Sequence, residues 1–144
     1  MGIEETGTAE QAVVIKIGLE FVQVYEFTDA ETGVTYSWNA TEGKRLAQAG
    51  NAEVLLVDLN AAGITKETLR ILAPEVDVDR ALSLPSTALL SPLLFVPHRG
   101  KHVCIDGWHR ITKVVHQGVS TLPAVVLTLG EAAAIRVGGQ DASS

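Results

Sequence analysis

Hydrophobic positions in the first fifty residues follow a β-strand pattern. Residues 11–38 are rich in β-branched and aromatic side chains, and residues 28–33 supply Asp, Thr and Gly for a turn. This pattern predicts a β-hairpin. Asn39 or Thr41 can then cap a short helix over residues 44–48. The chain is therefore expected to begin with strands and to continue into one short helix.

Further along the chain, short apolar runs bounded by turn residues predict buried strands. These runs occupy residues 53–59, 93–96, 101–105 and 122–127. Residues with helical periodicity lie between and after them. They are residues 65–73, with Thr65 as cap and Pro74 as the stop, and residues 77–82, 108–116 and 131–136. Residues 85–92 are predicted to form a loop.

The strand predicted at residues 101–105 leads directly into the sequence Asp106-Gly107-Trp108-His109-Arg110 and a helix. The start of a helix presents unpaired backbone N–H groups and the positive end of the helix dipole, so it binds anions readily. Gly107 would let a ligand approach the main chain closely. Arg110 can donate two hydrogen bonds to a phosphate, and His109 can add a third. The sequence therefore predicts a phosphate-binding turn.

The helix predicted over residues 108–116 has two different faces. Apolar residues at helical spacing predict a buried face, whereas basic residues predict an exposed stripe. The apolar set is Trp108, Ile111, Val114 and Val115, and the basic set is His109, Lys113 and His116. Thr112 and Lys113 are accordingly candidates to extend the phosphate site along the helix.

Several residues of this region have two interpretations. Asp106 can coordinate Mg²⁺ or act as a general base, or it can simply cap the helix. Trp108 can stack on a base or point into the core. Cys104 is interpreted as a small buried hydrophobic residue rather than a nucleophile. If the turn at Arg99 has three residues, His98 and the histidine at position 102 would face each other as metal ligands.

Composition narrows the range of functions and cellular settings that the chain could have. The chain has 144 residues, enough for one domain, and a formal net charge of −6, which argues against a general nucleic-acid binder. Cys104 is the sole cysteine, which excludes an internal disulfide and is compatible with a reducing, cytoplasmic setting. The first ten residues lack the features of a secretory signal, and no apolar run is long enough to cross a membrane. A protein outside the membrane is therefore expected.

Residues 53–128 resemble the ParB/sulfiredoxin-like superfamily. The resemblance lies in a strand, the "DGWHR" box, a helix, Gly118 and the strand beginning Leu122-Pro123. Members carry a Gly-x-x-Arg or Gly-x-His-Arg box that binds the phosphates of ATP, ADP or CTP. The resemblance implies that Gly107, His109 and Arg110 contact phosphates.

The chain also departs from named members of this superfamily. Sulfiredoxin has its catalytic cysteine where this chain has Trp108, so sulfinic acid reduction is not expected. Partition ParB proteins carry DNA-binding and dimerisation domains after this module, whereas this chain stops at Ser144. The catalytic glutamate of the free-serine kinases has no clear counterpart here.

The expected fold is α/β or α+β, a small mixed sheet with packed helices and an N-terminal β-hairpin extension. The expected divisions are a flexible tail (1–10), the hairpin extension (11–50), a ParB/sulfiredoxin-like nucleotide-binding core (51–137) and a second flexible tail (138–144).

The first functional hypothesis is a hydrolase or phosphotransferase acting on a nucleoside triphosphate, ATP or CTP, with Mg²⁺ as a candidate cofactor. Asp106 would bind Mg²⁺ or act in catalysis with His109, while the phosphates would contact Gly107, His109, Arg110, Thr112 and Lys113. The alternative is a non-enzymatic, nucleotide-responsive regulatory or DNA-associated module of a plasmid or phage. A third hypothesis is a protein-binding relative that uses residues 13–38. A homodimer is compatible with each.

Overall fold

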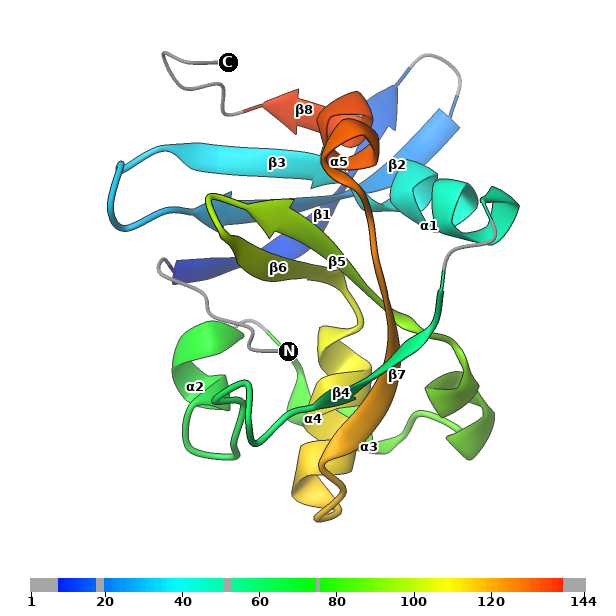
Figure 1. Cartoon of the computed structure of the whole chain (residues 1–144). Helices are drawn as coiled ribbons and strands as arrows, with labels where there is room; N and C mark the ends of the chain where they lie inside the picture. Colours follow the sequence, from blue (N-terminus) through cyan, green and yellow to red (C-terminus); the bar gives the residue numbers. More distant parts are fainter. Residues whose placement is uncertain (1–7, 18–19, 51–52, 75, 139–144) are drawn as a thin grey trace.

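The chain has an α+β fold in which the described strands form two four-stranded sheets (Figure 1). The computed structural model describes residues 8–17, 20–50, 53–74 and 76–138. The first sheet has the strand order β1-β2-β3-β8 and the second has the order β4-β7-β5-β6. The strands of the first sheet are β1 (Thr8–Ile17), β2 (Glu20–Thr28), β3 (Thr35–Asn39) and β8 (Arg136–Gly138).

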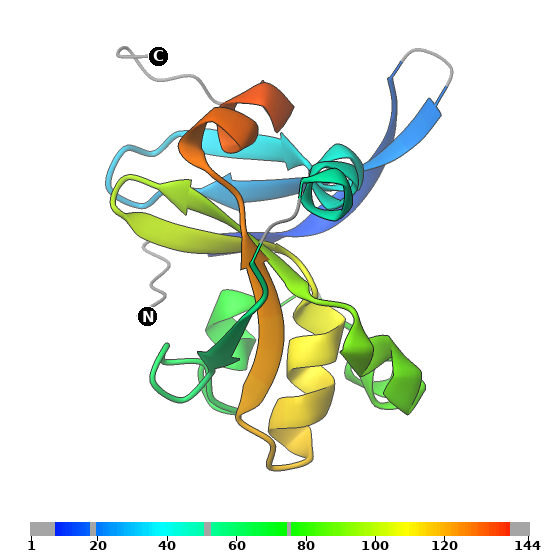
Figure 2. The same ribbon diagram turned by 45° about the vertical axis from the view of Figure 1, so that its right-hand side comes forward.

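The first sheet is antiparallel throughout. Val13 lies opposite Val24, Tyr25 lies opposite Trp38, and Trp38 in turn lies opposite Arg136. The predicted hairpin is thus confirmed but is part of a three-stranded meander, to which the end of the described chain adds β8. The far ends of β1 and β2 project away from the rest of the molecule (Figure 2).

The second sheet is mixed, because β5 and β7 run parallel while its other pairs are antiparallel. Its strands are β4 (Leu55–Asp58), β5 (Leu93–His98), β6 (Lys101–Asp106) and β7 (Thr121–Val126). All four coincide with predicted apolar runs. The β5–β6 turn has only two residues, Arg99 and Gly100, with φ values of 50° and 77°. Positive φ at both positions matches the twist of the two strands.

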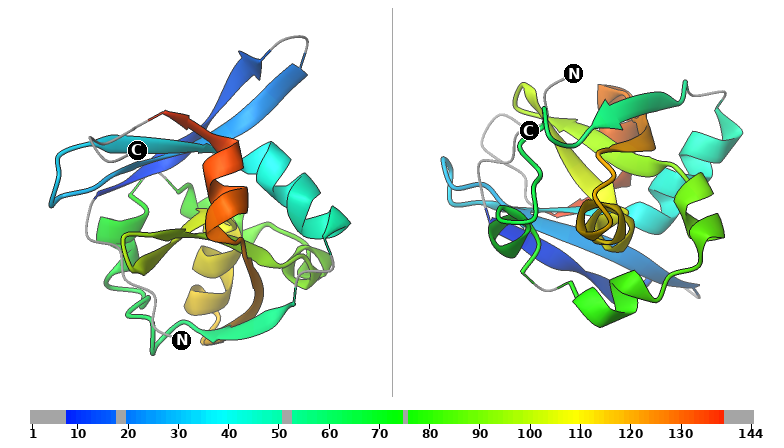
Figure 3. Two further views of the ribbon diagram at one scale, coloured as in Figure 1. Left: turned by 45° about the horizontal axis from the view of Figure 1, so that its top comes forward. Right: turned by 90° about the horizontal axis from the view of Figure 1, so that it is seen from below.

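Side chains cap three of the five described helices, and the other two lack a capping side chain. They are α1 (Ala40–Ala49), α2 (Leu69–Leu72), α3 (Val78–Leu82), α4 (Trp108–His116) and α5 (Leu129–Ile135). Asn39 is the cap of α1, since its Oδ1 accepts the N–H of Glu42 at 3.0 Å. The hydroxyl of Thr41, the other candidate cap, instead accepts the amide of Gln23. Helices α1 and α5 lie side by side (Figure 3).

Two predicted segments differ from the structure. The helix expected from Thr65 begins only at Leu69, because the Thr65 and Thr68 hydroxyl groups accept backbone N–H groups and form a separate turn. The predicted loop over residues 85–92 contains a 3₁₀ helix, η1 (Ser86–Leu90).

Both sheets contribute to one buried cluster. The first sheet supplies mostly aromatic side chains and the second mostly aliphatic ones. The largest fully buried members include Tyr25, Phe27, Tyr36, Trp38, Phe95, Ile105 and Ile111. The predicted boundary at residue 50 lies between α1 and β4, but it does not separate two cores.

The predicted tails are shorter than expected where the structure describes them. Residues 8–10 belong to β1, and Gly138 belongs to β8, because both segments pair with neighbouring strands. The remaining tail residues, 1–7 and 139–144, lie outside the described residues. Among the described helices, none has the length and apolar character needed to span a membrane.

Candidate functional site

The β6–α4 turn is built around Gly107, which is the N-cap residue of the nine-residue helix α4. Its φ of 119° and ψ of 10° lie in a region that side chains disfavour. The space on one side of its Cα is already filled, since an added Cβ would lie 2.3 Å from Leu93 Cδ2 and 3.2 Å from Arg110 Nη2. Leu93 and Arg110 thus occupy this close approach to Gly107, and a ligand could reach the turn only from another direction.

The first turn of α4 retains unpaired donors. The backbone N–H groups of Trp108, His109 and Arg110 donate no hydrogen bond to an acceptor among the described residues. The first helical bond runs from the N–H of Ile111 to the carbonyl of Gly107, at 2.9 Å. The positive end of this helix therefore has three backbone donors without an acceptor among the described residues.

Arg110 is held between the start of β5 and the end of β6. Its Nη1 donates to the carbonyls of Ser91 and Pro92, the second at 3.0 Å. Its Nη2 donates to Asp106 Oδ2 at 2.7 Å. The side chain is 12% exposed, so this guanidinium is largely enclosed by the protein.

Asp106 faces a second cation that the sequence analysis missed. Lys44 Nζ, on α1, lies 3.7 Å from Asp106 Oδ1. Helix α1 can approach this closely because Gly43 packs against β5, where an added Cβ would be 2.9 Å from Leu94 Cδ2. The amphipathic pattern of residues 40–49 could have indicated the buried face of α1 but not its neighbour. The carboxylate therefore pairs with Arg110 and Lys44, and Gly107 rather than Asp106 occupies the N-cap position.

His109 is a half-buried residue of α4, which packs against α3. Burial lowers its pKa below the ordinary value, the positive charge of Arg80 lowers it further, and Asp77 partly opposes both. This shift favours the neutral imidazole. It can donate one hydrogen bond, but Arg110 and Lys44 supply the positive charge of the turn.

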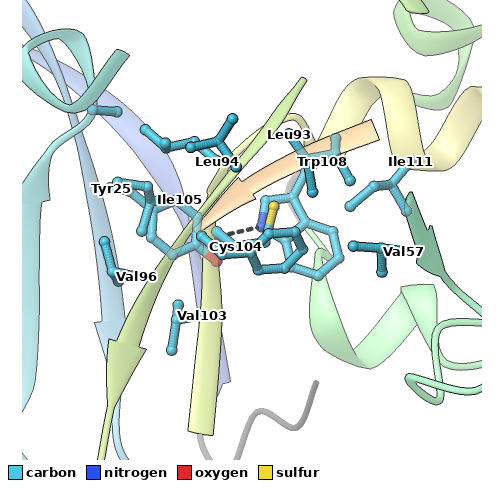
Figure 4. Close-up of a cluster of buried hydrophobic side chains, with 14 of the residues drawn as sticks. Tyr25, Val57, Leu93, Leu94, Val96, Val103, Cys104, Ile105, Trp108 and Ile111 are labelled. Atoms are coloured by element: carbon cyan, nitrogen blue, oxygen red, sulfur yellow. Dashed lines mark hydrogen bonds between the residues drawn. The ribbon is translucent and has the colours of Figure 1, made fainter. Parts of the chain in front are cut away.

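Trp108 points into the core, beside Val57 and Ile111 (Figure 4). Its indole Nε1 donates to the carbonyl of Cys104 at 2.9 Å. Of its two interpretations, the core interpretation is the one seen in this structure. Cys104 is also buried, as expected for a small hydrophobic residue.

Three other residues of α4 do not join the turn. The hydroxyl of Thr112 is buried and donates to the Trp108 carbonyl at 2.8 Å. Lys113 is 6% exposed and its Nζ donates to the carbonyl of Leu82 in α3. The predicted exposed basic stripe is therefore wrong at Lys113, because α3 covers this side of α4. His116 Nδ1 lies 2.9 Å from the Thr112 carbonyl oxygen, one turn further from Gly107.

The histidine interpretation also changes. The β5–β6 turn has two residues, so His102 lies opposite Pro97 and not opposite His98. His98 is buried instead against Asp29, with Nε2 2.9 Å from Oδ2. No group of three His, Cys, Asp or Glu residues in the described ranges could hold a metal ion.

The residues at the turn do not fit a resident Mg²⁺ either. Each oxygen of Asp106 faces a cation, one from Arg110 and the other from Lys44. A dication would be repelled by both positive charges, so Mg²⁺ could not bind Asp106 without displacing them.

Comparisons with family models, curated proteins and solved structures give no match. The resemblance of residues 53–128 to the ParB/sulfiredoxin-like superfamily therefore depends on the residues quoted for it. The geometry itself provides three unpaired amides, two cations and one internal carboxylate, an arrangement that suits recognition of a larger anion.

Proposed function

We propose that this chain is a nucleotide-binding protein whose β6–α4 turn receives the phosphates. The observation that carries the proposal is the start of α4, where three unpaired backbone N–H groups lie beside the Arg110 guanidinium. Backbone donors, a helix dipole and an arginine are a common combination for binding phosphate. The Asp-Gly-x-His-Arg box at residues 106–110, which resembles the superfamily, supports a nucleotide as the source of the phosphates.

The hydrogen-bonding capacity of Arg110 supports a shared role. A guanidinium has five N–H donors. Ser91 and Pro92 accept from Nη1, and Asp106 accepts from Nη2, while Nε and the second Nη2 hydrogen have no acceptor among the described residues. Arg110 can therefore bind the two carbonyls just before β5 and still have N–H donors left for a phosphate.

Binding without turnover is the form of this function that the contacts favour. A general base needs an available lone pair close to the proton that it removes. Both oxygens of Asp106 are already in ion pairs, one with Arg110 and the other with Lys44, so neither oxygen is available to take a proton from a substrate. We therefore propose a nucleotide-responsive module whose occupancy is sensed by a partner.

The binding proposal is tested by NMR shift mapping with ATP, CTP and tripolyphosphate. We expect the largest shifts at the amides of Trp108, His109 and Arg110. Arg110→Lys keeps the charge but loses the planar fork, so binding should weaken about tenfold. Arg70→Lys, on the exposed side of α2, is the matched control and should bind like the native protein. Shifts confined to other elements would refute a site at this turn.

Hydrolysis or phosphoryl transfer is the second candidate, and His109 is the observation that favours it. His109 lies in the first turn of α4 next to Arg110, and its lowered pKa favours the neutral imidazole, which can accept a proton. Product analysis of ATP and CTP, with and without magnesium, tests this activity. Turnover that His109→Gln abolishes would support an enzyme. Triphosphates that remain intact after long incubation would mean that the protein binds nucleotides without turnover.

A further inference from the structure

We propose that Asp106 is an internal competitor for the phosphate position and that Lys44 is a further phosphate-binding residue. In this view the Asp106 carboxylate occupies the cationic site until a nucleotide phosphate displaces it. The inference rests on the proposed function, because it describes how the same turn is regulated. It also places a residue of α1, Lys44, in the phosphate site.

The first support is the way in which Arg110 is fixed. The carbonyls of Ser91 and Pro92 hold Nη1, so the guanidinium keeps its orientation whichever anion lies on its other edge. That edge consists of Nε and Nη2, which is a common side for a two-point contact with an oxyanion. Asp106 Oδ2 already accepts a hydrogen bond from Nη2 at 2.7 Å. An incoming phosphate must therefore share this edge with a carboxylate or replace it.

The second support is the convergence of two cations on one carboxylate. Lys44 Nζ lies 3.7 Å from Oδ1, while Arg110 holds Oδ2. Lys44 is 44% exposed, whereas Asp106 and Arg110 are each largely buried. The cluster therefore carries one surplus positive charge and opens to solvent on the Lys44 side. A phosphate with more negative charge than a carboxylate would be held more strongly by the same two cations.

The third support is the mobility that the exchange requires. The Asp side chain can leave Arg110 by rotation about χ1, without a change in the β6 backbone. Displacement would turn the carboxylate away from both cations and toward solvent, and this change is what a partner could detect.

The test measures the affinity for ATP and tripolyphosphate by calorimetry in EDTA, so that metal binding is excluded. Asp106→Asn keeps the shape of the side chain and removes its charge, so we expect both ligands to bind about tenfold more tightly. Lys44→Met should weaken binding about threefold. Arg45→Met is the matched control, because Arg45 is the adjacent cation on α1 and pairs with Glu42 rather than with Asp106. Thermal unfolding of each variant confirms that it is folded.

The outcomes separate the two proposals. Equal or weaker binding by Asp106→Asn in EDTA, with clear binding by the native protein, overturns the competitor role and leaves the proposed function intact. Equal losses in Lys44→Met and Arg45→Met overturn the specific role of Lys44. If neither the native protein nor Asp106→Asn binds either ligand, the proposed function fails, and the inference fails with it. Binding by Asp106→Asn alone supports the inference.

Discussion

At the scale of single residues, Gly107 combines two separate constraints. Its φ of 119° strains any residue with a Cβ atom, and the nearby Leu93 side chain leaves no room for that atom. The first constraint is set by the sharp change of direction between β6 and α4. The second comes from the core, because Leu93 is buried. Gly107 is therefore required by the fold, whether or not a ligand binds there.

Gly107→Ala is expected to lower the free energy of unfolding by about 3 kcal/mol, which combines backbone strain with overpacking. Urea unfolding followed by tryptophan fluorescence measures the loss. Gly118→Ala is the control, because Gly118 has a φ of 79° but would place its Cβ in open space. That control should lose only about 1 kcal/mol. Equal losses would show that Leu93 moves aside without cost.

The sequence marks the residues of the turn but not their partners. An Asp-Gly pair between a strand and a helix is a local signal, so Gly107 and Arg110 could be identified. The acceptors of Arg110 are main-chain carbonyls of Ser91 and Pro92, and a carbonyl leaves no trace in residue identity. Lys44 comes from a distant helix. Only tertiary packing brings these groups together.

At the scale of elements, α1 shows how a local cap supports the candidate site. Asn39 ends β3 and caps α1, so one side chain fixes the angle between the strand and the helix. The same helix carries Gly43 against β5 and Lys44 beside Asp106. A change at the cap should therefore reach the β6–α4 turn.

Asn39→Ala is expected to lower the free energy of unfolding by about 1 kcal/mol, the usual loss for an N-cap. Chemical denaturation measures it, and NMR shifts at Asp106 report whether α1 has moved. Asn60→Ala, at an exposed position after β4, should leave both quantities unchanged. An unchanged stability for Asn39→Ala would mean that packing of α1 alone sets its start.

Elements with strong local signals were predicted, and elements stabilised by tertiary pairing were not. Helix α4 begins and ends where the apolar periodicity and Gly118 indicate. Strand β8 has only three residues, Arg136–Gly138, and exists because β3 offers it an edge. Segments this short have too little sequence to show a period. The same reason explains the missed 3₁₀ helix η1.

At the scale of the whole molecule, a buried polar pair joins the two sheets. Asp29 follows β2 in the first sheet, and His98 ends β5 in the second. Burial alone would raise the pKa of Asp29, but hydrogen bonds from His98 and the Glu31 amide, with the charges of His98 and Arg99, hold it below its usual value. The His98 ring also contacts Tyr36, with ring centroids 4.4 Å apart.

Asp29→Asn should lower the free energy of unfolding by about 2 kcal/mol at neutral pH, because a hydrogen bond to a charged group is lost. The lowered pKa fixes the sign of the pH dependence. The stabilisation by Asp29 is present above pH 3.8 and is lost as the pH falls through the lower folded value. Acid titration of both proteins should therefore show the difference shrinking below pH 3.8. A constant difference would contradict this assignment.

Strand β8 also has a consequence for biosynthesis. During translation β3 is synthesised early, whereas β8, which pairs with its open edge, is synthesised only after α5. During that interval the unpaired edge of β3 can recruit strands from other nascent chains. Synthesis of β8 thus covers the open edge of β3 at Ser37 and Trp38.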